Sequence, residues 1–262
     1  MANKIQLTDV TSEPTALPKT RFILVHGDKG GVGKSFVAQA ICDVLYSKTK
    51  KLAIIDADTA NPDVSRMFAS TVPCLHADIR KDNGWMDVMD FVLKHPGYTV
   101  VMNTPAGIGQ YMKKDMTSFS EFLAQQECPV ELEMWWAMNI QHDSVNLFSK
   151  AYTDYGQFFK KIVVVCNLHF SNGDKSNEGP FFLWNECQLR TKLENNNGTT
   201  LFFPGLHLRV VCKLFAPLNI MPFVDAIDAV IGEKIALEHS ERWKLQQWRE
   251  DINKLLTPVL GI

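Results

Sequence analysis

The sequence predicts an α/β fold with a single doubly wound, mostly parallel sheet flanked by helices. Three observations predict it. Apolar runs of strand length recur along the 262 residues, segments with helical periodicity separate them, and several runs are continuous rather than alternating. Continuous apolar runs are expected of strands covered on both faces. Alternation of strand and helix favours parallel neighbours joined by helical crossovers.

Each expected strand is an apolar run bounded by polar or turn-forming residues. The six expected strands are residues 21–26, 51–56, 98–103, 130–138, 161–167 and 199–203. Segments with the apolar spacing of a helix face lie between them. The five expected helices are residues 35–47, 85–94, 118–126, 143–155 and 181–193.

The chain divides into three expected parts. Residues 1–20 lack the apolar centre of a secretory signal and are expected to form a flexible arm before the first strand. Residues 21–232 contain the alternating strands and helices and form the main domain. Residues 233–262 predict a C-terminal helix, interrupted only at Pro258, that packs on this domain or on a partner.

The C-terminal segment has an expected apolar stripe and a balanced charge. The stripe would consist of Trp243, Trp248, Ile252 and Leu255. Between residues 233 and 254 there are five basic and five acidic residues, so anionic lipid would attract the segment little. A membrane role is therefore not expected.

Composition restricts the possible functions. The net charge of -2 argues against a protein dominated by phosphate-backbone binding. Six scattered cysteines form no CxxC pair, which disfavours disulfide and zinc frameworks and favours a cytoplasmic location. Cys42, Cys166 and Cys212 lie in apolar runs and are expected to be buried as small hydrophobes.

The segment GDKGGVGKS, residues 27–35, is the strongest functional signal. It follows an expected strand and opens an expected helix, the context that makes a glycine-rich loop ending in GKS a phosphate-binding loop. Glycines let backbone N–H groups turn towards an anion, Lys34 can reach the β- and γ-phosphates, and Ser35 can bind Mg²⁺. The residues expected to hold the nucleotide here are Gly30, Gly31, Val32, Gly33, Lys34, Ser35 and Phe36.

A second lysine, Lys29, stands in the same loop, where Lys34 already serves the phosphates. The sequence KGGVGKS resembles the deviant Walker A motif of the ParA/MinD family of P-loop ATPases. This resemblance implies an ATP-bound homodimer in which Lys29 reaches the nucleotide of the facing subunit. There Lys29 would act in catalysis like an arginine finger, neutralising charge as the γ-phosphate leaves. A solvated lysine on the rim of the loop is the alternative.

Two carboxylates end the second expected strand. Asp56 and Asp58 are two residues apart, so both side chains face the same way on an extended backbone. The segment AIIDADTANPDVSRMF resembles the family's switch I. The resemblance implies that Asp58 orients the attacking water as a catalytic residue, and that Asp56, with Ser35, supports the Mg²⁺ site. A turn-initiating role for Asp58 is the alternative.

The segment YTVVMNTPAGIGQ, residues 98–110, resembles the family's Walker B and switch II region. Asn103 stands where the family usually has an aspartate, and an amide adds no negative charge towards Mg²⁺. This departure bears on hydrolysis more than on nucleotide binding. The resemblance implies that the backbone N–H of Gly107 contacts the γ-phosphate.

Two further positions are candidates for the base pocket. Asn167 ends a strand, and its amide offers the donor and acceptor that the N6–N7 edge of adenine needs. The segment FFPGL resembles the element on which the family rests its adenine, which implies contacts from Pro204 and Gly205. The GTPase-type NKxD motif is absent, which favours ATP over GTP.

The resemblance extends over nearly the whole chain from Arg21. Details such as GKSFVAQAI and CNLHFSNGDKSNEGPFF are similar to plasmid-borne TraL and StbB-type ATPases. The resemblance implies a partner or adaptor protein that stimulates weak hydrolysis, and non-specific DNA as a second partner. Basic residues available for a DNA surface are Lys113, Lys114, Lys160, Lys161, Arg190 and Lys192, although a solvated surface is the more common explanation of such pairs.

Three functions are compatible with these residues. The first is a ParA/MinD-like dimerisation switch in plasmid partition, stability or conjugative transfer. The second is an ATP-binding scaffold with little hydrolysis, which Asn103 favours. The third is a metabolic relative on the same fold, either an ATP-dependent ligase or an iron–sulfur reductase, for which the sequence offers no dedicated motif.

Overall fold

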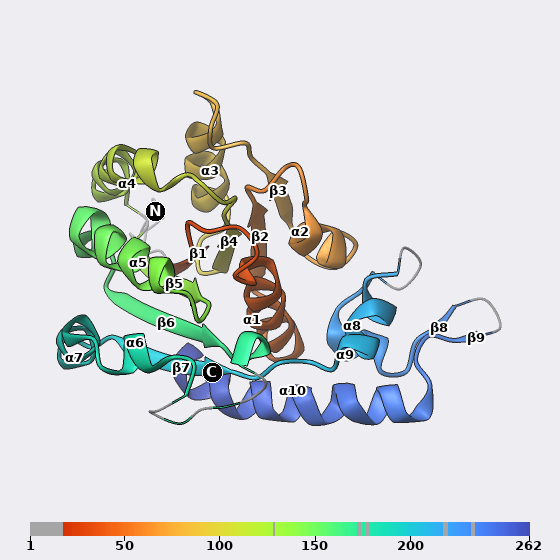
Figure 1. Cartoon of the computed structure of the whole chain (residues 1–262). Helices are drawn as coiled ribbons and strands as arrows, with labels where there is room; N and C mark the ends of the chain where they lie inside the picture. Colours follow the sequence, from red (N-terminus) through yellow and green to blue (C-terminus); the bar gives the residue numbers. More distant parts are fainter. Residues whose placement is uncertain are drawn as a thin grey trace, which may run out of the picture.

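Seven parallel strands form one sheet in the order β3-β2-β4-β1-β5-β6-β7 (Figure 1). A computed structural model of the protein describes residues 18–127, 129–171, 174, 176, 179–216, 220–231 and 234–262, with the backbone alone at 234 and 235. The expected arm falls largely outside these residues. The strands are β1 (Thr20–His26), β2 (Leu52–Asp56), β3 (Cys74–His76), β4 (Thr99–Asn103), β5 (Val130–Met138), β6 (Lys161–Asn167) and β7 (Thr199–Phe203).

Helices cover both faces of this sheet. One layer contains α1 (Lys34–Lys48), α2 (Asp63–Phe68), α8 (Leu208–Leu214), α9 (Phe223–Ala226) and α10 (His239–Leu260). The other contains α3 (Gly84–Leu93), α4 (Gly109–Ala124), α5 (His142–Tyr155), α6 (Phe182–Asn185) and α7 (Gln188–Asn195). Short 3₁₀ turns occur at η1 (Gly156–Phe158) and η2 (Leu168–Ser171), and a small antiparallel pair is formed by β8 (Val230–Ile231) and β9 (Lys234–Ile235).

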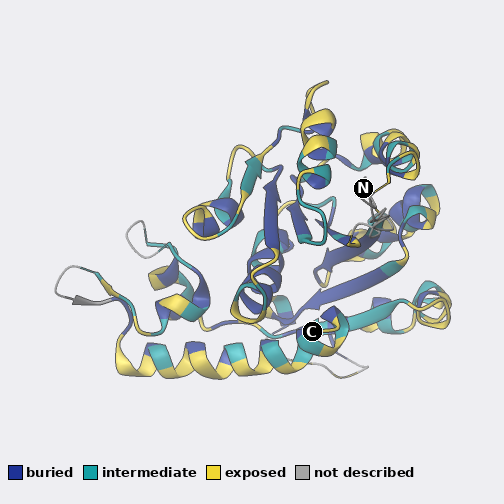
Figure 2. Cartoon of the chain, turned by 180° about the vertical axis from the view of Figure 1, so that it is seen from behind, coloured by how far each residue is buried: buried dark blue, intermediate teal, exposed yellow. Residues whose placement is uncertain are grey.

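The continuous apolar strands explain the two layers. In β1, Ile23 and Val25 pack into the core beneath α1, whereas Phe22 and Leu24 pack into the opposite core. Alternate residues of a strand face opposite sides, so a strand that is apolar throughout needs cover on both faces. Figure 2 shows the central strands as buried, with exposed residues on the outer sides of the helices. The predicted doubly wound α/β fold is confirmed.

Several predicted boundaries are wrong. Helix α4 begins at Gly109 rather than near residue 118, and the single helix expected over 181–193 is two helices separated at Glu186 and Cys187. The elements α2, β3, α8, α9, β8 and β9 were not predicted, since each is too short to display a clear period. Cys42 and Cys166 are buried as expected, but Cys212 is exposed on the outer side of α8.

Helix α10 packs along α1, β7, α8 and α9. Contrary to prediction, Pro258 does not interrupt it, because Pro258 falls in the last turn and Gly261 closes the helix by donating to the carbonyl of Thr257. The buried stripe also differs from the predicted one. Its apolar members are Leu245, Trp248, Ile252, Leu256 and Leu260, while Trp243 is 51% exposed and Leu255 is half-buried. Within the described ranges, no helix is long and apolar enough to cross a membrane.

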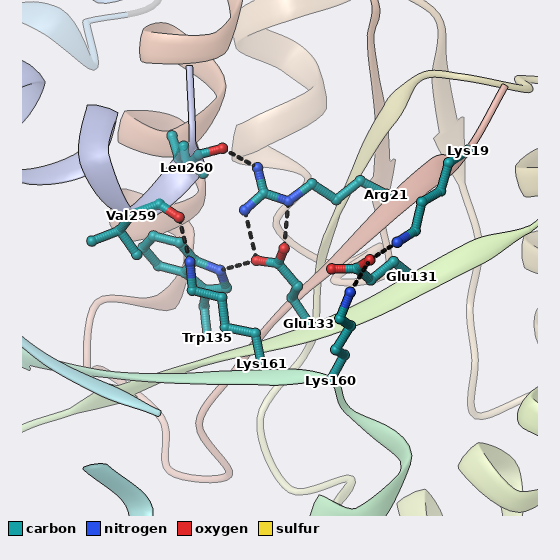
Figure 3. Close-up of polar contacts among 9 residues, drawn as sticks. All are labelled: Lys19, Arg21, Glu131, Glu133, Trp135, Lys160, Lys161, Val259 and Leu260. Carbon is teal, nitrogen blue, oxygen red and sulfur yellow. Dashed lines mark hydrogen bonds and ion pairs between the residues drawn. The ribbon is translucent and has the colours of Figure 1, made fainter. Parts of the chain in front are cut away.

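Polar side chains at the amino-terminal ends of β1 and β6 bind the C-terminal end of α10 (Figure 3). Arg21 of β1 forms a bidentate pair with the buried Glu133 of β5, with Nη2 donating to Oε2 over 2.8 Å. The same guanidinium donates to the carbonyl of Leu260, and Lys161 donates to the carbonyl of Val259. Cations at these terminal carbonyls complement the negative end of the helix dipole. The position of α10 is therefore fixed independently of its middle turns.

Candidate functional site

The polar residues at the ends of the parallel strands meet at one edge of the sheet. The phosphate loop follows β1, Asp56 ends β2, Asn103 ends β4 and Asn167 ends β6. The carboxyl ends of parallel strands lie at the same edge, where α/β proteins bind their ligands. A cavity of about 680 Å³ opens there. Its walls include Gly30, Gly31, Gly33, Lys34, Ser35, Phe36, Gln39, Asp58, Asn61, Asp63, Ala106, Asn167, His169, Phe170, Leu206, Val211 and Phe215.

The loop before α1 forms an anion cradle. Gly31 and Gly33 have φ angles of 73° and 95°, in the left-handed region that favours glycine. A Cβ atom at Gly33 would also lie 2.3 Å from Nδ2 of Asn167. No side chain caps the N-terminus of α1, so its first N–H groups remain for an anionic ligand. Val32 is buried and contributes its backbone rather than its side chain.

Lys34 lies at the base of this cradle. Its side chain is buried, and its Nζ donates to the carbonyl of Lys29 over 3.0 Å. Burial lowers the pKa of Lys34, and the negative charges of Asp58 and Asp28 oppose this effect. An anionic phosphate would compensate the buried charge further. The geometry therefore fits a phosphate ligand.

Asp56 and Asn103 form a corner beside Ser35. Oδ2 of Asp56 accepts the backbone N–H groups of Val64 and Ser65, each over 3.0 Å, and so holds the start of α2. Nδ2 of Asn103 donates to Oδ1 of Asp56 over 3.1 Å and lies 3.4 Å from Oγ of Ser35. Burial raises the pKa of Asp56, whereas the hydrogen bonds from Ser65, Asn103 and Val64 lower it.

This corner fits a hydrated divalent cation. Oδ1 of Asn103 is buried and has no hydrogen-bond partner among the described residues, which is an unusual state for a polar atom. A hydroxyl, a carboxylate and an amide oxygen are the hard ligands or water acceptors that Mg²⁺ prefers. No group of three His, Cys, Asp or Glu side chains that could hold a metal occurs in the described part of the chain. The cation would therefore depend on Ser35, the ligand phosphates and water.

The switch II segment is tied to the phosphate loop through Asp28, a residue the sequence analysis did not select. The N–H of Gly107 donates to the carbonyl of Asp28 over 2.9 Å. The N–H of Gly109 donates to the Asp28 carboxylate over 2.8 Å. Gly107 is exposed, with a φ of 73°, and it does not line the cavity. Its N–H would have to leave Asp28 before it could contact a γ-phosphate.

Lys29 points away from the cavity. Its Nζ contacts Oε1 of Gln141 and the carboxylate of Asp143, both next to the start of α5. The lysine lowers the pKa of the Asp143 carboxyl by this contact. The side chains of Lys29 and Asp143 are 30% and 55% exposed, so the ion pair is a surface one. Such pairs contribute at most about 1 kcal/mol and open easily.

Asn167 is positioned by both ends of its amide. Nδ2 donates to the carbonyl of Val32 over 3.1 Å, and Oδ1 accepts the N–H of His169 over 3.1 Å. One amide hydrogen and one oxygen lone pair are left after these bonds. The residue therefore joins the phosphate loop to the end of β6 and still offers a donor and an acceptor to a base.

The wall beyond Asn167 was only partly predicted. Pro204 and Gly205 line a neighbouring cavity of about 580 Å³ against α10, rather than the nucleotide cavity. The nucleotide cavity is closed here by His169, Phe170, Leu206, Val211 and Phe215. Leu206 is the last residue of the predicted FFPGL element, but the aromatic residues lie on separate elements that no local pattern connects.

Comparison with known proteins agrees with this site. Residues 19–107 match the ParA family, described as NUBPL iron-transfer P-loop NTPase. The chain is 28% identical over 240 residues to Protein MobD of Acidithiobacillus ferrooxidans. The aligned region covers 90% of this chain and 96% of that protein. It is 34% identical over 95 residues to the cytosolic Fe-S cluster assembly factor nubp2 of Xenopus tropicalis, covering 32% of this chain and 34% of that protein.

Solved structures with a related arrangement have low sequence identity to the chain. One is a nucleotide-binding protein from Archaeoglobus fulgidus in complex with ADP, which is 17% identical to this chain. The alignment covers 70% of this chain and 82% of that chain, and the TM-score is 0.44. Another is the MinC:MinD cell division protein complex of Aquifex aeolicus, with 16% identity, 56% and 68% covered, and a TM-score of 0.41.

The phosphate loop, the order of the parallel strands and the match over the first four strands agree with one another. The likeness to MobD extends over most of the chain. Residues 19–107 therefore resemble the P-loop NTPases of the ParA family, and the chain as a whole is similar to MobD.

Proposed function

We propose that the chain is an ATP-dependent dimerisation switch with weak, partner-stimulated ATPase activity. The position of Lys29 carries this proposal. Lys34 lies within the nucleotide cavity, whereas Lys29 extends from the rim of the same loop to Gln141 and Asp143 on the surface. A cation held there by a weak contact is available to the triphosphate of a facing subunit.

Each site residue has an expected task in this cycle. Lys34 and the N–H groups from Gly30 to Phe36 would hold the phosphates, and Ser35 with Asp56 would hold the cation. When bound, Mg²⁺ would neutralise charge on the β- and γ-phosphates. Asp58, on the cavity wall, would orient water for attack, and Lys29 of the second subunit would stabilise the charge that develops.

Base binding would involve the other end of the cavity. Asn167 retains a donor and an acceptor, and the apolar wall around Phe170 and Leu206 can enclose a planar ring. Pro204 and Gly205, predicted as direct contacts, would instead shape this wall from behind. We take residues 21–232 as the ATPase domain of a cytoplasmic protein and residues 233–262 as a segment docked on it.

A mixing experiment tests the proposal. Lys29→Ala lacks the cation supplied to the partner, and Asp58→Ala lacks the water-orienting carboxylate of its own site. Each variant alone should be nearly inactive as an ATPase. An equimolar mixture should recover ATPase activity, because each mixed dimer has one complete site. Lys114→Ala, which removes an exposed lysine elsewhere, should be fully active. Absence of recovery on mixing would contradict a role for Lys29 in the second subunit.

Asn103 favours a second candidate, an ATP-binding scaffold with little hydrolysis. Its amide occupies the corner beside Ser35 and Asp56 without adding a negative charge. Single-turnover hydrolysis by the protein and by Asn103→Asp separates the two candidates. A large increase on restoring the carboxylate supports the scaffold, and equal rates support the switch.

For the process served, we propose plasmid DNA partition, stability or conjugative transfer. The support is the similarity of the sequence to TraL and StbB-type ATPases and the alignment with MobD over 96% of that protein. The cargo would be recognised through a partner or adaptor protein. This assignment is tested by comparing the stability and transfer of a host plasmid with and without the gene, and with Lys34→Ala.

Direct DNA binding has less support. Five of the six basic residues available for a DNA surface contact groups of this chain, namely Lys113, Lys160, Lys161, Arg190 and Lys192. They lie on α4, at the start of β6 and on α7 rather than in one patch. Retention on non-specific DNA that rises with ATP and falls with salt would establish direct binding. Retention that ignores the nucleotide would exclude it from the cycle.

An iron–sulfur function, as named for NUBP2, lacks support in this chain. The sequence has no CxxC pair, and no metal-binding cluster of His, Cys, Asp or Glu occurs among the described residues. The likeness to the NUBP2 protein of Xenopus tropicalis extends over only 34% of its length. It agrees with a shared nucleotide-binding half.

A further inference from the structure

Trp248, in the middle of α10, contacts Phe36, which lines the nucleotide cavity, and the loop that carries Leu206, a second residue lining this cavity. Its indole Nε1 donates to the carbonyl of Pro204 over 2.9 Å, and its side chain is buried. Pro204 begins the loop between β7 and α8, and Leu206 of this loop lines the cavity at the base end. The C-terminal helix thus holds the backbone that carries the base wall.

The indole ring of Trp248 also packs against Phe36, next to the phosphate loop. The ring centroids of Trp248 and Phe36 are 5.3 Å apart, with an angle of 34° between the planes. Phe36 follows Ser35 in the first turn of α1 and lines the cavity. Trp248 also meets Phe223 edge-on at 5.3 Å and Phe203 at 6.2 Å. Its position between α1 and the loop after β7 is therefore fixed from several sides.

The loop between β7 and α8, residues 204–207, which we call the base loop, needs the support that Trp248 gives. The chain has no regular structure between the end of β7 at Phe203 and the start of α8 at Leu208. Gly205 packs so closely on η2 that a Cβ atom there would lie 3.1 Å from Cα of His169. A loop without regular structure has no strand ladder to fix its backbone, so specific hydrogen bonds position it.

We propose that Trp248 is a positioning residue in the nucleotide cavity. It sets the separation between the phosphate wall, formed by residues 30–36, and the base wall, formed around Leu206. Affinity for the base then depends on the C-terminal helix, while affinity for the triphosphate does not. This inference rests on the proposed function, namely that ATP binds in this cavity. It concerns a residue that contacts the cavity walls rather than the nucleotide.

The remainder of α10 makes the proposal testable with a mild substitution. The helix is held next to Trp248 by the buried ion pair of Arg249 with Asp43 of α1, and at its end by Arg21 and Lys161. Trp248→Phe retains an aromatic ring and removes the indole N–H. The helix should therefore stay docked, and the bond to Pro204 should be lost.

The experiment compares two ligands by calorimetry in the presence of Mg²⁺. ATP uses both walls of the cavity, whereas inorganic tripolyphosphate uses the phosphate loop alone. Trp248→Phe should bind ATP about 3- to 10-fold more weakly than the wild type, the effect expected from one lost hydrogen bond. Its affinity for tripolyphosphate should be unchanged. Steady-state hydrolysis should show a raised KM with little change in kcat, because the reacting phosphate is held as before.

Trp243→Phe is the matched control, since Trp243 lies on the same helix and is 51% exposed. This variant should bind both ligands like the wild type. If Trp248→Phe does not fold, benzothienylalanine at position 248 replaces the indole N–H by sulfur in a ring of similar shape and serves the same comparison.

The outcomes separate the inference from the proposed function. Equal ATP affinity in Trp248→Phe and wild type would overturn the inference, as would parallel losses for ATP and tripolyphosphate. A wild-type protein that binds ATP no more tightly than tripolyphosphate would show that the cavity has no base site, and the proposed function itself would fail.

Discussion

Asn103 determines the charge beside Asp56 and Ser35. Its Nδ2 lies 3.1 Å from Oδ1 of Asp56, and both residues are fully buried. The amide stabilises the ionised form of Asp56 without adding a second negative charge. A carboxylate in its place would repel Asp56 unless a cation lay between them.

We expect Asn103→Asp to make stability depend on Mg²⁺. With EDTA at neutral pH, two buried carboxylates at this distance should lower the unfolding temperature relative to the wild type. Addition of Mg²⁺ and ATP should restore it more in the variant than in the wild type. Thermal unfolding followed by circular dichroism measures this difference.

Asn185→Asp is the control for this comparison, because Asn185 accepts from Arg190 on the far side of the fold. It should show no extra response to Mg²⁺. The same absence of response in Asn103→Asp would mean that no cation binds at this corner.

His26 should make the protein sensitive to acid. It is fully buried, with Nδ1 2.8 Å from Oγ1 of Thr104. Burial, together with the charge of Lys34, lowers the pKa of His26 from 6.5 to about 3. Between these values the unfolded chain binds more protons than the folded chain. The free energy of unfolding should therefore fall as pH decreases below 6.5, by up to about 1.4 kcal/mol per pH unit from this group.

Urea denaturation at pH 7.5 and pH 5.5 measures this dependence. His26→Gln, which cannot acquire the proton, should lose less stability between the two values than the wild type. Parallel losses would show that other groups cause the acid sensitivity.

At the scale of elements, the buried pair of Asp43 and Arg249 joins α1 to α10. Nε of Arg249 donates to Oδ2 of Asp43 over 2.8 Å, and Oδ1 accepts the N–H of Val224 over 2.8 Å. Burial raises the pKa of Asp43, while Arg249 and the Val224 bond lower it. Loss of the guanidinium would leave a buried carboxylate without its charge partner.

Arg249→Ala should therefore destabilise the protein by about 3–5 kcal/mol, the range for breaking a buried pair from one side. Equilibrium unfolding in urea measures the change. Lys254→Ala, an exposed position on the same helix, should cost less than about 0.5 kcal/mol. Similar effects of the two substitutions would mean that the pair does not hold α10 in solution.

The elements also show what the sequence can predict. Six strands were predicted near their observed bounds because each contains an apolar run of strand length. The helix α2 has six residues and its start is held by Asp56, a contact from β2 that no local pattern reveals. Pro258 is tolerated because its position in the last turn depends on where the helix ends. Tertiary contacts decided both cases.

Residues of the phosphate loop that line the cavity were predictable from the sequence, whereas the opposite wall was predictable only in part, through Asn167 and Leu206. Lys34, Ser35 and the glycines follow from one continuous motif. Phe170, Val211 and Phe215 come from η2, α8 and the residue after α8, and meet only once the sheet is assembled. The role of Asp28 in holding Gly107 and Gly109 likewise depends on strand β4 lying beside β1.

At the scale of the whole molecule, the contact of Lys29 with Asp143 would compete with the proposed dimerisation. Both side chains are partly exposed, so the ion pair costs little to break. Asp143→Asn should free Lys29 in both subunits and strengthen the proposed ATP-bound dimer by at most about 30-fold, the equivalent of about 1 kcal/mol for each of the two ion pairs. Sedimentation over a range of concentrations measures the dimer dissociation constant. A weaker dimer in Asp143→Asn would mean that Asp143 belongs to the dimer interface instead.

The measurement that tests the account most directly is the mass of the protein in solution as a function of nucleotide. Light scattering after size-exclusion chromatography should give 29.6 kDa with ADP and twice that mass with Mg²⁺ and a non-hydrolysable ATP analogue. Lys29→Ala should bind the analogue and remain at the lower mass. A wild-type protein with one mass in both nucleotides, unaffected by Lys29→Ala, would contradict the dimerisation switch and leave a monomeric nucleotide-binding protein.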